Sequence, residues 1–378
     1  MISHELRTPL TGVLSMSEML EEQVAGPLND RQVTYVAGIK ASGERLLNVV
    51  NGVLSYTHLL SGKVQLDAQP CELAGLLEFS EKRQLYRFIL GGGSNILFTK
   101  DFGGIILKNE IKGIEELHED SEYVYVKAGA GETWHRFVTY CVERNWAGLE
   151  NLSLIPGKVG ASPIQNIGAY GVELRDVFLD LEAYHISERK IYTFTNVDCE
   201  FGYRESVFKN HARDQFIILS VTFRLRKRPV FHTSYGAIEQ ELERMGVKEL
   251  NIQAISRAVI NIRSAKLPDP RETGNAGSFF KNPSVTQGRL QELKKDFPGI
   301  VAYENLDGSY KLAAGWLIEQ CGWKGYRKGD AGCHDKQALV LVNYGNATGK
   351  EIYDLSEKIY ISVKERFGVE LLREVNIF

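Results

Sequence analysis

A run of three glycines is the first stretch whose residue types suit chemistry. Gly91, Gly92 and Gly93 follow the apolar letters FIL and precede Ser94 and Asn95. Glycines leave backbone N–H groups unobstructed, and a loop of such groups can bind an anion such as a pyrophosphate. The Ser94 hydroxyl and the Asn95 amide add side-chain donors. A tight turn without a ligand suits the same letters equally well, so the loop alone leaves both interpretations open.

A second stretch, residues 150–171, reads ENLSLIPGKVGASPIQNIGAYG. It holds six glycine or proline residues among small polar side chains, with few charges and little periodicity. Backbone of this irregular kind is usually bent to surround something, rather than exposed as an ordinary surface loop. The second stretch therefore favours the binding interpretation of the first.

The elements before these stretches are helical in pattern. Apolar residues recur at helical spacing over residues 2–22 and again over residues 31–60. Between them, Gly26 and Pro27 supply turn chemistry. Two long amphipathic helices with a short connection predict an antiparallel hairpin. Its apolar stripe needs a second copy or another domain to cover it, so we expect self-association through the hairpin.

A histidine motif lies at the start of this hairpin. Residues 4–10, HELRTPL, resemble the phosphoacceptor box of sensor histidine kinases, in their dimerisation and phosphotransfer domain. The resemblance implies that His4 is a possible phosphoacceptor and that Glu5 holds its imidazole in a nucleophilic state. We interpret residues 1–62 as this hairpin and residues 63–80 as a junction that carries a remnant of the kinase ATP-binding domain. No later stretch resembles the rest of that domain.

Residues 86–378 carry a longer series of motifs. They include FGYRESVFK, SYGAIEQEL, RSAKLPDP, GNAGSFFKNP, KLAAGWLIEQCGW and, at the end, LLREVNIF. With the two irregular stretches, these resemble the UDP-N-acetylenolpyruvoylglucosamine reductase family, in the family's order and spacing. That resemblance implies an enzyme of peptidoglycan precursor synthesis that uses FAD and NADPH and takes a UDP-sugar substrate. The tyrosine motifs are similar to the first type of the family, which closes a tyrosine loop over its substrate.

The resemblance also implies the fold. We expect an α+β protein, in which the hairpin precedes a flavin-binding α/β body and a separate α/β substrate subdomain. The flavin-binding region would span residues 81–266, as two small subdomains, and the substrate subdomain residues 267–368. Residues 369–378 would form a strand that returns to the active site. Family members carry a longer segment before the glycine loop, so we interpret the first flavin subdomain as incomplete and the chain as a chimera.

Three residues match the catalytic positions of the family. Ser278 matches the proton donor, while Arg204 and Glu374 match the pair that polarises the substrate carboxylate and stabilises an enolate. A serine hydroxyl is a weak acid and needs electropositive neighbours to serve. Each residue also has a plain interpretation: a helix cap for Ser278, a surface ion pair for Arg204 and an ordinary strand residue for Glu374. Their occurrence together in the family's order favours the catalytic roles.

The resemblance assigns the remaining site residues to ligands. Tyr203, Tyr235, Arg263 and Lys266 match positions that meet the substrate or NADPH. Arginine and lysine suit phosphate oxygens, as a fork and as a point charge respectively. Besides the glycine loop, the residues assigned to FAD are Ile155, Pro156, Gly157, Ser162, Pro163, Gln165, Asn166, Gly168 and Ala169.

Composition narrows the class of protein. The 378 residues are 43% hydrophobic and 25% charged, as in soluble globular proteins of two or three domains. A formal net charge of −3 argues against nucleic acid or a membrane surface as a partner. No apolar run approaches the roughly 20 residues that span a bilayer. Five scattered cysteines suggest reduced thiols in the cytoplasm and no metal site.

A function of another class remains as the alternative. In it, the chain is a two-component signalling fragment: the hairpin dimerises and binds a response regulator, and the reductase body is inactive. A motif for an ATP site would favour this alternative, and we find none in the sequence.

Overall fold

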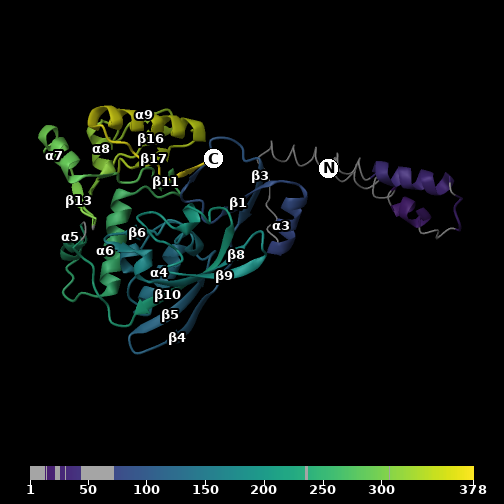
Figure 1. Cartoon of the computed structure of the whole chain (residues 1–378), viewed down its shortest axis with the longest axis horizontal. Helices are drawn as coiled ribbons and strands as arrows, with labels where there is room; N and C mark the ends of the chain where they lie inside the picture. The colour runs from purple at the N-terminus through teal and green to yellow at the C-terminus, as the bar shows by residue number, and fades with distance from the viewer. Residues whose placement is uncertain are drawn as a thin grey trace. The chain divides into compact units, whose positions relative to one another are not determined.

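The structure is a computed structural model that describes residues 13, 15–21, 26–29, 31–43, 72–234, 237–305 and 307–378. The chain divides into two compact units, residues 1–72 and residues 73–378 (Figure 1). In the first unit, the described residues 15–21 and 31–43 are helical, and Glu21 pairs with Lys40 at 2.7 Å. His4 lies outside the described residues, and the antiparallel hairpin stays a prediction.

The second unit is built on a five-stranded antiparallel sheet. Its strands, in spatial order, are β4 (Ile114–Glu119), β5 (Tyr123–Gly129), β10 (Phe216–Arg226), β8 (Phe178–His185) and β9 (Lys190–Thr195). The letters YVYVKAG and FIILSVTF are rich in β-branched and aromatic residues, which fit a pleated and half-buried surface. In β5, alternate residues are buried, as expected for a strand with one face on a core.

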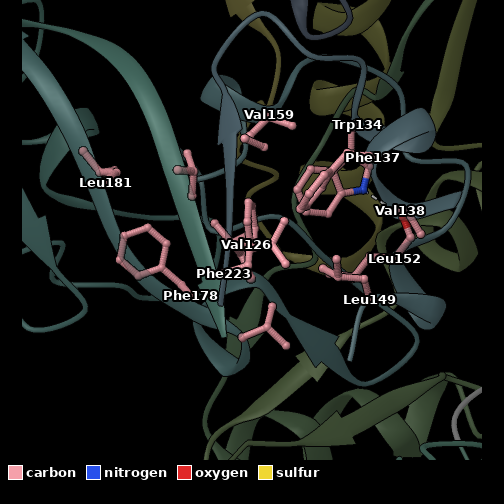
Figure 2. Close-up of a cluster of buried hydrophobic side chains, with 14 of the residues drawn as sticks. Val126, Trp134, Phe137, Val138, Leu149, Leu152, Val159, Phe178, Leu181 and Phe223 are labelled. Carbon is pink, nitrogen blue, oxygen red and sulfur yellow. Dashed lines mark hydrogen bonds between the residues drawn. The ribbon is translucent and has the colours of Figure 1, made fainter. Parts of the chain in front are cut away.

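One face of this sheet is covered by helix α4 (Trp134–Glu143). The ring of Phe137 lies 4.6 Å from that of Phe223 on β10, between centroids, and the Trp134 indole donates to the Leu152 carbonyl at 2.9 Å (Figure 2). All four of these residues are fully or almost fully buried. The core therefore fixes the segment around Leu152, which leads directly into the irregular stretch.

A smaller parallel pair precedes the sheet. Strand β1 (Tyr86–Leu90) pairs with β3 (Gly104–Lys108), and helix α3 (Leu73–Lys82) comes before them. Leu77 of α3 is fully buried in a cluster with Ile186 and Ile217. Because this contact ties α3 to the second unit, that unit begins ahead of residue 81, where the sequence pattern placed the start of the flavin-binding region.

A second layer of helices and small sheets completes the unit. Helices α5 (Ile238–Arg244) and α6 (Ile252–Lys266) pack on each other through Ile238, Ile255 and Val259. Beyond them, β11 (Gly274–Ser278), β17 (Val340–Asn343), β16 (Ala331–Cys333) and β15 (Arg327–Lys328) form a four-stranded sheet, and β12 (Ser284–Val285), β14 (Tyr310–Leu312) and β13 (Ala302–Glu304) a three-stranded one.

Three helices cover these sheets: α7 (Gln287–Asp296), α8 (Ala314–Gln320) and α9 (Gly349–Phe367). Helix α9 lies along the four-stranded sheet (Figure 1). It starts with a capping box of Thr348 and Glu351, and it ends at Gly368, whose φ is +62°. A glycine is needed at that position because other residues rarely adopt this left-handed conformation.

The end of the chain crosses back to the start of the unit. Strand β18 (Asn376–Ile377) pairs in parallel with β2 (Ile96–Leu97), which directly follows the glycine loop. The remaining elements are short: β6 (Gly168–Ala169), β7 (Val172–Glu173), and the 3₁₀ turns η1 (Glu150–Leu152), η2 (Val159–Ala161), η3 (Leu174–Asp176) and η4 (Val207–Lys209). Among the described helices, none is both long and apolar enough to cross a membrane.

The sheet core gives a first prediction. Phe223→Ala should lower the free energy of unfolding of the second unit by about 3–5 kcal/mol, because it removes a fully buried ring and leaves a cavity. Phe79→Ala is the control, since Phe79 is 43% exposed, and should cost less than about 1 kcal/mol. Urea unfolding followed by tryptophan fluorescence measures this unit, because all four tryptophans lie in it. Equal losses would contradict the packing described for the sheet.

Candidate active site

The two irregular stretches pack against each other. A Cβ atom added to Gly92 would lie 2.9 Å from the Cα of Gly157, and one added to Gly157 would lie 2.8 Å from the Ser94 hydroxyl oxygen. Gly157 also has a φ of +112°, which disfavours any other residue. Contacts this close leave no room for a side chain at Gly92 or at Gly157.

The side chains of several residues predicted to bind FAD point into the protein and support the loop from inside. The Asn166 side chain donates to Glu173 and to the Gly202 carbonyl, both at 3.0 Å, and accepts from the Arg175 N–H. Its side chain is fully buried, and Ser162 and Pro163 are buried as well. Ile155 and Ala169 pack against the sheet core. These side chains hold the shape of the loop.

Asn95 and Gln165 join three distant segments. The Asn95 amide donates to the Gln165 side-chain oxygen at 2.9 Å and to the Glu374 carbonyl at 3.2 Å. The Gln165 amide lies 3.5 Å from a carboxylate oxygen of Glu374. The glycine loop, the second stretch and the C-terminal segment thus meet at one point.

Arg204 is held at this meeting point by an unusual backbone. It lies in a tight turn closed by hydrogen bonds between Gly202 and Glu205, and its φ is +56°. This conformation is unfavourable by about 1–3 kcal/mol of free energy for a residue other than glycine, and residues strained in this way are often found at functional sites. The guanidinium donates to the Gly168 carbonyl at 2.7 Å and pairs with Glu374 at 3.3 Å. The two residues predicted to act together therefore lie in contact, and their catalytic role stays a prediction.

The pair lies in a cationic neighbourhood. Glu374 is only 13% exposed, and its burial raises the pKa of its carboxyl group, while the charges of Arg204, Lys209 and Lys281 oppose that rise. Lys209 donates to the Arg204 carbonyl at 3.3 Å, and Lys281 pairs with Glu205 at 2.6 Å. Burial lowers the pKa of Lys209. Positive charge therefore exceeds negative charge around the pair.

Ser278 ends strand β11 beside Glu374. Its neighbour Phe279 accepts a hydrogen bond from the Glu374 N–H at 2.9 Å. Ser278 is exposed, and the strand register shifts between Asn275 and Ser278, a kind of irregularity that redirects side chains. The structure thus contradicts the alternative of a helix cap, because Ser278 closes a strand.

Of the four residues predicted to meet the substrate or NADPH, the structure describes three. Tyr203 lies beside Arg204, and the Lys311 ammonium lies 4.0 Å from the centroid of its ring. Arg263 is partly buried and donates to the Leu154 carbonyl at 3.3 Å, and burial lowers the pKa of its guanidinium. Lys266 is exposed at the end of α6, and Tyr235 lies outside the described residues.

The sequence analysis missed three lysines near the pair. Lys209 and Lys281 surround Arg204 and Glu374, and burial lowers the pKa of Lys311 next to Tyr203. The signal was present, since FGYRESVFK, GNAGSFFKNP and KLAAGWLIEQCGW each carry one of these lysines. In the part of the chain that the structure describes, no group of three or more His, Cys, Asp or Glu residues is placed to hold a metal ion.

Comparison with known proteins covers most of the chain. Residues 269–378 match the C-terminal domain of UDP-N-acetylenolpyruvoylglucosamine reductase, residues 68–187 match a FAD binding domain, and residues 1–62 match the His Kinase A (phospho-acceptor) domain. The FAD-binding match begins within the stretch 63–80 that we interpreted as a junction, in agreement with the packing of α3.

Curated relatives agree over long alignments. The UDP-N-acetylenolpyruvoylglucosamine reductase of Flavobacterium johnsoniae is 51% identical over 298 residues, which is 79% of this chain and 88% of the relative. That of Amoebophilus asiaticus is 53% identical over 305 residues, or 81% and 90%. The crystal structure of the reductase from Thermus caldophilus, 24% identical, covers 80% of this chain and 88% of its own with a TM-score of 0.54, and supports the fold. The chain belongs to the UDP-N-acetylenolpyruvoylglucosamine reductase family.

Proposed function

We propose that this chain reduces UDP-N-acetylenolpyruvoylglucosamine with NADPH, through bound FAD. The observation that carries the proposal is the Arg204–Glu374 pair beside Ser278, at the point where the two irregular loops meet the C-terminal segment. Three residue types from three distant parts of the sequence converge there. The family to which the chain belongs supplies the substrate and the reaction.

The residues present fit FAD. The loops at 91–95 and 155–161 approach so closely that a Cβ at Gly92 would clash with Gly157, and the three glycines leave their backbone N–H groups unobstructed by side chains. Such groups suit a diphosphate. We assign the phosphate contacts to the glycine loop, with Asn95 and Gln165 near the Glu374 end. Bound there, the flavin would supply hydride chemistry, which side chains do not provide.

Arg204 and Glu374 would act on the substrate carboxylate. The Arg204 cation orients a carboxylate and favours the negative charge that develops on it when the neighbouring double bond is attacked. An ionised Glu374 would oppose that charge. Burial raises the pKa of Glu374, and we propose that its carboxyl group takes up a proton when the substrate carboxylate pairs with Arg204, so that it donates a hydrogen bond to the developing enolate.

Ser278 would deliver the proton. Ser278 is an exposed residue, and the charges of Arg204, Lys209 and Lys281 act on Glu374, whose N–H donates to the carbonyl of the next residue, Phe279. Positive charge near a hydroxyl stabilises the alkoxide that remains after the proton leaves, which makes serine a usable acid.

The remaining predicted ligand residues would either contact the substrate or NADPH, or hold the second stretch in place. Lys266 and Tyr235 stay our proposals for contacts to the diphosphate of the substrate or the phosphates of NADPH. Tyr203, with Lys311 against its ring, would add a donor beside the substrate. Arg263 is turned toward the Leu154 carbonyl, so we assign it mainly to holding the second stretch in place.

We also propose where in the cell the enzyme is located and where its domains begin and end. The described cysteines are free thiols, and such proteins are typical of a reducing compartment, so we place the enzyme in the cytoplasm. We propose a phosphotransfer-like hairpin within residues 1–62 and a junction after it. The flavin-binding region would then reach residue 266, followed by a substrate subdomain to residue 368 and the returning strand to residue 378.

We also propose that the first unit drives self-association. Its described residues expose large apolar side chains, including Met16 at 69%, Met19 at 54% and Ile39 at 50%. Two helices cannot bury such a surface alone, whereas a second copy can. The match to a phospho-acceptor domain supports the same contact.

Truncation tests the self-association. The whole chain should sediment as a dimer or larger, and a chain that begins at Leu73 as a monomer. Analytical ultracentrifugation distinguishes them. In the whole chain, Met16→Glu together with Ile39→Glu should also give a monomer, because charges on the stripe oppose its burial. Equal masses for the whole and truncated chains would rule the contact out.

The raised pKa of Glu374 predicts a pH dependence of stability. The contribution of a carboxyl group with a raised folded-state pKa is fully present below the unfolded pKa, and it is lost as pH rises through the folded pKa. Glutamine does not titrate. Glu374→Gln should therefore gain stability relative to wild type as pH rises from about 4 to about 8. Urea unfolding without FAD at several pH values measures the difference.

Glu241→Gln is the matched control for this test. Arg244 and Asn261 lower the pKa of Glu241 to about 2, so its contribution is complete above the unfolded pKa. Its difference from wild type should stay constant between about pH 5 and about pH 8. A constant difference for Glu374→Gln over the same range would mean that Glu374 is not buried as described.

Ser278→Ala should separate the two halves of the reaction. Bleaching of the flavin absorbance by NADPH needs no proton donor and should keep its rate. Reoxidation by the enolpyruvyl substrate should slow by about two to four orders of magnitude, the usual effect of losing a positioned general acid. Stopped-flow absorbance measures each half. If both halves slow together, Ser278 has a structural role, and a wild-type protein that shows neither half would refute the proposed function.

A further inference from the structure

A cluster of four charged residues lies at the ends of the parallel strands β1 and β3. Glu110 follows β3, and the glycine loop follows β1 at the same edge, where the Asn109 N–H donates to the Leu90 carbonyl at 2.8 Å. In sheets of parallel strands, ligands bind outside the carboxyl ends. The cluster therefore borders the place where the glycine loop offers its N–H groups.

Three lysines share the single carboxylate of Glu110. Lys108 lies 2.8 Å from it, Lys158 3.2 Å and Lys112 3.3 Å. Led by the hydrogen bond from Lys108, these contacts lower the pKa of Glu110 to about 2, so the carboxylate stays ionised at neutral pH. One negative charge does not balance three positive ones. The cluster as a whole keeps a net positive charge next to the loop.

Lys158 differs from the other two lysines in its position. Its side chain is 14% exposed, whereas those of Lys108 and Lys112 are 61% and 49% exposed. Its Cγ lies 3.6 Å from the point that a Cβ on Gly92 would occupy, and 3.8 Å from the same point on Gly91. The stem of Lys158 thus packs on the glycine loop itself. A charge with so little water around it is weakly screened.

We propose that Lys158 is a cofactor-binding residue, whose ammonium group neutralises the diphosphate of FAD at the glycine loop. Glu110 is then its counter-ion while no diphosphate is bound, and it competes with the cofactor for Lys158. This inference rests on the proposed function, because it takes FAD as the ligand of the loops. It concerns a residue that lies between the predicted contacts Gly157 and Ser162 and was not among them.

The opposing interpretation is that Lys158 and Glu110 form an ion pair that only ties two loops together. The two interpretations predict opposite effects of Glu110→Gln. If Lys158 meets the diphosphate, loss of the competing carboxylate should tighten FAD binding, because all three lysines keep their charge. If the pair only ties the loops, loss of either partner should loosen the cradle and weaken binding.

Titration of the full-length apoprotein with FAD, followed by flavin fluorescence, distinguishes them. Lys158→Met should raise the Kd by about tenfold, since it removes a charge-assisted contact to the diphosphate. Glu110→Gln should lower the Kd a few-fold. Lys108→Met, which removes an exposed partner of the same carboxylate, is the control and should leave the Kd within about twofold. Lys158→Arg should retain most of the affinity.

Riboflavin supplies a second readout, since it carries the flavin ring and no phosphate. Lys158→Met should leave riboflavin binding unchanged. Equal losses for riboflavin and FAD, or weaker FAD binding by both Lys158→Met and Glu110→Gln, would overturn the inference and leave the proposed function intact. If Lys158→Met does not fold, Glu110→Gln decides alone, with tighter binding in support and weaker binding against. A wild-type chain that binds no FAD would overturn the proposed function and this inference with it.

Discussion

The ion pair between Arg204 and Glu374 is the interaction on which the arrangement of the site depends. Both side chains are mostly removed from water, and a buried charge is tolerated only when its partner and hydrogen bonds are in place. The guanidinium meets that condition through Glu374 and the Gly168 carbonyl. The hydrogen bond and the ion pair of the Arg204 guanidinium therefore connect the turn at Gly202 to the second loop and to the C-terminal segment.

The two halves of the site use different chemistry. Where the loops meet, the main chain of Gly92 lies against that of Gly157, and neither position has room for a side chain. Where the substrate would react, side chains supply every group, from a strand end, a turn and the returning C-terminal segment. A backbone cradle binds any diphosphate in much the same way. In the proposed function, specificity for the substrate would therefore come from the second half, which contains Arg204, Glu374 and Ser278.

Much of this could be predicted from the sequence, because it follows from motifs that lie within a few residues of each other. The α+β class and the family are of this kind. What escaped prediction depends on contacts between distant residues. Nothing in GKVG indicates that Lys158 meets Glu110, and the inward direction of Asn166 is set by Gly202 and Glu173. The place of α3 likewise depends on Leu77 meeting Ile186 and Ile217.

The left-handed backbone of Arg204 has an evolutionary consequence. Glycine would adopt a φ of +56° without strain. A mutation of Arg204 to glycine would therefore relieve the backbone strain at this position. Selection for stability alone would therefore favour loss of the arginine and its positive charge. An arginine that persists there in a lineage is a record of selection on chemistry, and its loss would be an early sign that a descendant gene has been released from that selection.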